Sequence, residues 1–133
     1  MTEHPQVEIA YWAFISYSSA DAAWARWLQK AIETYEIPRR LVGHATWAGP
    51  APRRLRPVFR DRTELPADSD LTAKVREALA ASAFLIVISS PDAVASRWVD
   101  EEIRVFRELH GESRILAVIV AGSPSGEYED CFP

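Results

Sequence analysis

The residues of this chain that best suit a catalytic or ligand-binding role, by type and by spacing, lie at the acidic start of one predicted helix. Trp98 and Glu102 are four positions apart in a predicted helix, so their side chains share one helix face. An indole beside a carboxylate suits a ligand that carries a flat ring and a sugar. The pattern also has a structural explanation, because acidic residues in the first turns of a helix interact favourably with its dipole and a tryptophan there usually belongs to the core. Spacing alone leaves both interpretations open.

Arginine is concentrated in one stretch of the chain. It supplies 13 of the 15 basic residues, and seven arginines lie between positions 39 and 62: Arg39, Arg40, Arg53, Arg54, Arg56, Arg60 and Arg62. Such a stretch is typical of a solvated loop with scattered ion pairs. The alternative is a surface that faces phosphate, because the planar guanidinium group donates a fork of hydrogen bonds to phosphate oxygens.

The motifs of several common activities are missing. The sequence has no Gly-x-Gly-x-x-Gly, no Gly-x-x-x-x-Gly-Lys and no Gly-x-Ser-x-Gly, which mark dinucleotide sites, phosphate-binding loops and serine hydrolases. The histidines, His4, His44 and His110, lack the spacing of metal ligands, so we expect no metal site. The single cysteine, Cys131, excludes a disulfide within the chain and a cysteine-based zinc site.

Alternating apolar and amphipathic segments must position the candidate residues. Strands are predicted at 9–17, 57–59, 84–88 and 114–120. The first predicted helix follows the capping residues Ser18, Ser19 and Asp21 and ends before Pro38. Further helices are predicted from about Ser69 and over 97–109, with an irregular connection at 38–55 and a polar loop at 60–70. The apolar residues of the first helix recur at three- and four-residue steps: Trp24, Trp27, Leu28, Ala31, Ile32 and Tyr35.

This order of elements predicts the fold. The segment 84–88 shows no polar alternation, so both of its faces should be buried, as in a parallel sheet with helices on both sides. The segment 114–120 is another fully apolar strand. Strand–helix alternation with right-handed crossovers predicts an α/β, flavodoxin-like, doubly wound parallel sheet with strand order 2-1-3-4. Ligands bind such sheets outside the carboxyl ends of the strands, here near 16–19, 60–62, 89–91 and 121–123.

Length and composition indicate one globular domain. The chain has 133 residues, of which 48% are hydrophobic, and a net charge of -4. The negative charge argues against direct nucleic-acid binding. No apolar run approaches the length of a membrane span, and Met1–Glu8 does not resemble a signal peptide, so we expect a cytoplasmic protein without membrane contact.

Three motifs resemble those of Toll/interleukin-1 receptor (TIR) domains, in the right order and between the right elements. Phe14–Tyr17 resembles the opening strand of these domains. Arg56–Asp61, followed by Glu64–Pro66, is similar to their second strand and the BB loop after it. Ser89–Pro91 and the Ser-x-Trp-x-x-x-Glu pattern of 96–102 are similar to the end of their third strand and the helix behind it. The similarity covers roughly residues 9–121.

The resemblance implies an activity. Many bacterial and plant TIR domains cleave NAD+ at the nicotinamide–ribose bond and need a glutamate four residues after the helix tryptophan, which here is Glu102. Nicotinamide leaves NAD+ as a neutral molecule, so one carboxylate suffices where ordinary glycosidases use two. NAD+ is then the substrate, no cofactor is implied, and the product is ADP-ribose or a cyclic isomer. The substrate-binding residues implied are Phe14, Ser16, Ser18, Arg62 and Trp98.

The resemblance also implies partners and a domain organisation. TIR domains associate with one another, and the loop at 60–70 would supply an assembly surface through Asp61, Glu64, Leu65 and Pro66. Many bacterial members act in antiphage defence with a fused or partner sensor domain. We expect residues 1–133 to form a single TIR domain with a folded core at about 9–121. This domain would be the N-terminal part of a longer protein and would lack the last strand and helix of the family.

Two alternatives remain open. In the first, the chain is a TIR interaction module without catalysis, in which the loop at 60–70 carries specificity and Glu102 is a surface acid. In the second, it is a nucleotide-binding sensor that binds its ligand without turnover. Measuring NAD+ consumption, with a Glu102→Ala variant beside the natural sequence, distinguishes these functions.

Overall fold

Four parallel strands form the central sheet. The computed structural model describes residues 9–46, 49–60 and 72–120. The strands of this sheet are β1 (Tyr11–Ser16), β4 (Val58–Arg60), β5 (Ser82–Ser89) and β6 (Ile115–Ile119), in the order β4-β1-β5-β6. Each neighbouring pair is parallel. The predicted strand order, with the first and third strands at the centre, is confirmed.

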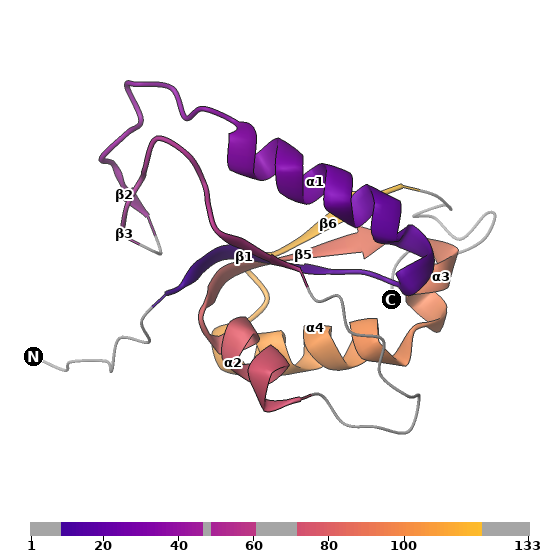
Figure 1. Cartoon of the computed structure of the whole chain (residues 1–133). Coiled ribbons are helices and arrows are strands. Elements are labelled where there is room, and N and C mark those ends of the chain that lie inside the picture. The colour runs from indigo at the N-terminus through magenta and orange to yellow at the C-terminus, as the bar shows by residue number, and fades with distance from the viewer. Residues whose placement is uncertain (1–8, 47–48, 61–71, 121–133) are drawn as a thin grey trace, which may run out of the picture.

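Helices cover both faces of the sheet (Figure 1). α1 (Ala22–Thr34) follows the short 3-10 turn η1 (Ser19–Asp21) and lies on one face. α2 (Ala73–Ala80) and α4 (Arg97–His110) lie on the other face, and the short helix α3 (Pro91–Ala95) follows β5. This arrangement is the expected flavodoxin-like α/β fold. Among the helices that the structure describes, none is long and apolar enough to cross a membrane.

Side-chain alternation along β1 divides the core into two layers. Ala13 and Ile15 belong to the layer beneath α1, whereas Phe14 belongs to the layer between the sheet and α2 and α4. The second layer buries large side chains completely, including those of Phe14, Leu79, Leu85, Val99 and Phe106. Ser16 comes two positions after Phe14, so its side chain points to the same face, toward α4.

Local sequence explains how three of the helices begin. Thr72, Ser90 and Ser96 each accept a hydrogen bond at the side-chain oxygen from the backbone N–H three residues on, which caps α2, α3 and α4. α4 ends at Gly111, whose φ of 83° suits a residue without a side chain. The sequence predicts the end of α4 but misses α3, and it places the start of α2 near Ser69 rather than at Ala73.

The connection after α1 is more ordered than predicted. The sequence predicts an irregular segment at 38–55, but β2 (Ala45–Thr46) and β3 (Gly49–Pro50) pair in antiparallel fashion within it. The N–H of Gly43 donates to the carbonyl of Ala51 at 2.7 Å, which extends the pairing. Strands of two residues are too short to show periodicity, so the sequence pattern could not reveal them.

Exposure differs in two places from what the apolar residues suggest. Leu116 and Ile119 of the apolar strand β6 are 49% and 46% exposed, because β6 lies at one edge of the described sheet. Trp24 and Trp27, assigned to the apolar side of the first helix, are 49% and 61% exposed. The small Ala25 is the fully buried residue of α1. The predicted absence of a last strand and helix concerns residues 121–133, which lie outside the described residues.

Candidate active site

Glu102 lies buried against the last residue of β1, at the carboxyl end of the sheet. The residue is 6% exposed. The hydroxyl of Ser16, which is fully buried, donates a hydrogen bond to Oε1 of Glu102 at 2.8 Å. A carboxylate removed from water needs such donors, because desolvation penalises an ionised group that lacks them. The structure therefore joins two of the residues that the sequence singles out, although 86 positions separate them.

Helix periodicity explains why Glu102 faces inward. The buried residues of α4 are Val99, Glu102, Val105 and Phe106, which follow one another at helical spacing. Glu102 is the sixth residue of α4, beyond the first turn in which the helix dipole acts. The dipole thus does not account for a carboxylate at this position, and the view of Glu102 as a surface acid is wrong.

A second buried carboxylate–serine pair lies at the same end of the sheet. Asp21, at the end of η1, is 8% exposed and accepts a hydrogen bond at Oδ2 from the hydroxyl of Ser90, directly after β5. The oxygen of Ser90 also accepts from the N–H of Ala93. This pair ties the segment after β1 to the first turn of α3. Sequence reasoning identifies Asp21 only as a helix cap, yet its side chain makes no capping bond.

The other predicted substrate-binding residues in the described part of the chain occupy different environments. Trp98 is half-buried, packs against the core beneath α4 and lies with its ring centroid 5.8 Å from the guanidinium carbon of Arg97. Ser18 is partly exposed and caps η1 by accepting from the N–H of Ala20 at 3.4 Å. Phe14 is fully buried and stacks on Phe59 with ring centroids 5.0 Å apart. A role for Phe14 in substrate binding stays a prediction.

The predicted assembly loop lies outside the described residues. This applies to Asp61, Glu64, Leu65 and Pro66, and to the predicted substrate ligand Arg62. Their roles stay predictions.

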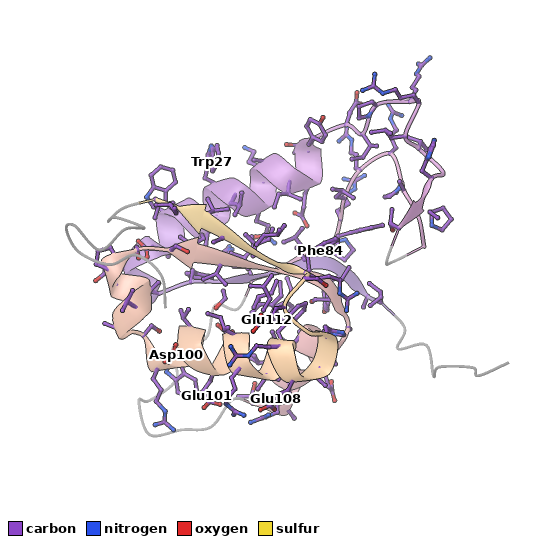
Figure 2. All side chains as sticks on the ribbon, turned by 180° about the vertical axis from the view of Figure 1, so that it is seen from behind. Trp27, Phe84, Asp100, Glu101, Glu108 and Glu112 are labelled. Atoms are coloured by element: carbon purple, nitrogen blue, oxygen red, sulfur yellow. The ribbon has the colours of Figure 1, made fainter. Side chains whose placement is uncertain are left out.

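The acidic neighbours of Glu102 face away from the sheet. Figure 2 shows Asp100, Glu101 and Glu108 on the outer side of α4. Arg104 donates to Glu101 at 2.6 Å and to Glu108 at 3.0 Å. The hydrogen bond from Arg104 lowers the pKa of the partly exposed Glu101 below its usual value. Asp100 and Glu101 are thus ordinary surface acids and serve as controls for Glu102.

The arrangement suits stabilisation of a positive charge. Glu102 is a carboxylate in a largely apolar layer, where its charge acts through a lower effective dielectric constant than in water. Ser16 restricts its orientation. In the ranges 9–46, 49–60 and 72–120, no group of three or more histidine, cysteine, aspartate or glutamate residues is placed to hold a metal ion.

Comparison with known proteins agrees with the motifs. A model of the family described as TIR domain matches residues 13–130. The chain is also 37% identical over 113 residues to the NAD(+) hydrolase ApTIR of Actinoplanes sp.. This alignment covers 84% of the present chain and 14% of the relative, so the chain spans about one seventh of the length of that protein.

Proposed function

From its place in the TIR domain family, to which this chain belongs, we propose that it is an NAD+ glycohydrolase with Glu102 as the catalytic residue. The observation that carries the proposal is the buried carboxylate of Glu102, held by the hydroxyl of Ser16 at the carboxyl end of the sheet. The similarity to a protein named as an NAD(+) hydrolase supports the substrate.

The proposed reaction breaks the bond between the anomeric carbon of the ribose and the pyridinium nitrogen of NAD+. The bonding electrons pass to the nitrogen, so nicotinamide leaves as a neutral molecule without a proton donor. Positive charge develops on the anomeric carbon and ring oxygen, and the carboxylate of Glu102 stabilises it. Water then adds to the anomeric carbon and releases a proton, which gives ADP-ribose. Attack by a nitrogen or oxygen of the same molecule would instead give a cyclic isomer.

We assign supporting roles to the residues that the resemblance to TIR domains implies. Ser16 acts on the reaction through Glu102, because its hydroxyl proton is directed at that carboxylate. Trp98 shares a helix face with Glu102 and would border the nicotinamide ring. Ser18 would approach the ribose from the end of β1, while Arg62 would contact the diphosphate. Phe14 would support the pocket of the nicotinamide ring from the core.

The biological setting is part of the proposal. We place the activity in antiphage defence in the cytoplasm, with a sensor domain and association between TIR domains controlling it. The loop at 60–70 would provide the contact between copies. A pure interaction module has weaker support, because a surface specificity role does not require a buried carboxylate.

The test is NAD+ consumption by the full-length protein. Glu102→Ala should remove nearly all cleavage, because losing such electrostatic stabilisation raises a barrier by roughly 3 kcal/mol or more. Glu102→Gln, which keeps the shape and loses the charge, should be almost as inactive. Glu101→Ala is the matched control on the outer side of α4 and should retain most activity. Cleavage by Glu102→Gln at a near wild-type rate would overturn the proposal in favour of an interaction module.

A further inference from the structure

The connection between α1 and β4 carries a strong local excess of positive charge. Residues 36–56 have a net charge of +4, whereas the whole chain has a net charge of -4. The segment contains one acidic residue, Glu36, and five arginines: Arg39, Arg40, Arg53, Arg54 and Arg56. Like charges gathered in one short segment repel one another, so the cluster has a cost unless an anion offsets it.

The described residues of this segment are folded and border an open hollow. Pro52, Arg53, Arg54 and Arg56 line a hollow of about 400 Å³. Its backbone is held on the end of α1, because the N–H of Ile37 donates to the carbonyl of Arg53 at 2.8 Å and Glu36 pairs with Arg54 in a β-bridge. Arg53 and Arg54 therefore belong to a stretch of backbone that is paired with the end of α1.

Glu36 holds two guanidinium groups side by side. Its Oε1 accepts from Arg53 at 3.0 Å and from Arg54 at 3.3 Å. The bond from Arg54, followed by that from Arg53, lowers the pKa of Glu36 below its usual value, so this carboxylate stays ionised near neutral pH. One carboxylate therefore orients two of the cations that line the hollow.

Three further arginines of the segment have no partner among the described residues. Within the described parts of the chain, the side chains of Arg39, Arg40 and Arg56 make no hydrogen bond or ion pair. Arg56 belongs to the lining of the hollow and is exposed. At least one guanidinium group in the lining is therefore available to a ligand in addition to the two that Glu36 orients.

The chemistry of the lining defines the ligand. Small-molecule pockets of a few hundred cubic ångströms are usually lined by apolar side chains, whereas three of the four described residues that line this hollow are arginines. Guanidinium groups match phosphate oxygens in geometry and charge. A long nucleic acid fits less well, because the rest of the chain has a net charge of -8 and would repel it beyond the segment.

The hollow is separate from the candidate active site. α1 runs antiparallel to the strands, so the connection after it begins at the amino ends of the strands, whereas Ser16 and Glu102 meet at a carboxyl end. Figure 1 shows the β2–β3 hairpin at the opposite end of the sheet from α3. We propose that this arginine-lined hollow is a second binding site, for a compact anion with at least two phosphate groups.

The test is isothermal titration of the full-length protein with pyrophosphate, ADP and adenosine. We expect pyrophosphate and ADP to bind and adenosine not to bind. Equal affinity for pyrophosphate and ADP indicates that the phosphate groups alone are recognised. Tighter binding of ADP that is lost when Arg53 and Arg56 are replaced indicates that the hollow takes a nucleotide. Both should bind equally well to the Glu102→Ala variant, which makes the result independent of the proposed NAD+ cleavage.

Two double variants with the same change in charge locate the site. Arg53→Gln with Arg56→Gln should weaken pyrophosphate binding by about tenfold or more, since each charge-assisted bond contributes substantially to affinity. Arg26→Gln with Lys30→Gln, on exposed positions of α1, should leave the affinity unchanged. Thermal melts of both variants check that the fold is retained. Absence of pyrophosphate binding, equal weakening in the two variants, or tighter binding of a 20-nucleotide DNA than of ADP would each overturn the proposal.

Discussion

Replacing Ser16 with alanine tests whether the buried hydroxyl positions the proposed catalytic carboxylate. The change removes one hydrogen-bond donor at 2.8 Å from Oε1 of Glu102 in a fully buried position, with little change in volume. A hydrogen bond to a charged group contributes about 1.5–3 kcal/mol, so we expect the free energy of unfolding to fall by about this amount. A reacting group that loses its orientation reacts more slowly, and we expect kcat for NAD+ cleavage to fall by about 10- to 100-fold.

Ser82→Ala provides the matched control. Ser82 is also fully buried, and its hydroxyl donates to the carbonyl of Ala78 at 2.6 Å, at the beginning of β5 and away from Glu102. We expect this variant to lose about 1 kcal/mol of stability and to keep its activity.

A double-mutant cycle separates the pairwise interaction from general destabilisation. Ser16→Ala, Glu102→Ala and the double variant are unfolded with denaturant, and the coupling free energy between the two sites should reach about 1–2 kcal/mol. Additive losses, or a Ser16→Ala enzyme with wild-type kcat, would refute the argument that Ser16 holds the carboxylate.

Three further predictions follow from single features of the chain. Burial lowers the pKa of His110 below its usual 6.5. The stability that this residue contributes is therefore complete above about pH 6.5 and is lost as the pH falls through the pKa in the folded state. His110→Gln should reduce the fall in Tm between about pH 7 and pH 5. Asp21→Asn keeps the shape of the side chain but loses the charge that accepts from Ser90, and denaturant unfolding should show a loss of about 1–3 kcal/mol; an unchanged midpoint would contradict this. Reversing both charges in the predicted assembly loop, Arg62→Glu with Glu64→Arg, should reduce association in sedimentation and specific activity together, whereas activity independent of protein concentration would count against assembly.

Much of the fold was predictable because it depends on local patterns. The apolar run at 84–88 lies within the central β5, and the run at 114–120 contains β6. Their succession with helical segments leaves few ways to arrange a parallel sheet, since crossovers are right-handed. The β2–β3 hairpin was not predictable, because its strands have two residues each and little periodicity.

Exposure was harder to predict than secondary structure. Hydrophobic residues predict which segments fold, but whether a strand lies at the centre or the edge of a sheet decides how much of it is buried. Leu116 and Ile119 are exposed because β6 has one neighbouring strand in the described sheet. Trp27 is exposed because helix α1 places Ala25, and not the tryptophan, against the strands.

The sequence by itself determined the type of fold through the periodicity of its segments, and it indicated the family through motifs of residues close together in the chain. It also singled out Glu102 as the candidate catalytic residue. Only the tertiary structure decided which side chains meet. Ser16 reaches Glu102 across 86 positions and Ser90 reaches Asp21 across 69, and neither spacing carries a signal of its own. These contacts arise because the parallel strands β1 and β5 end at the same edge, in a register that pairs Ser16 with Val87, and because alternation turns Ser16 toward α4.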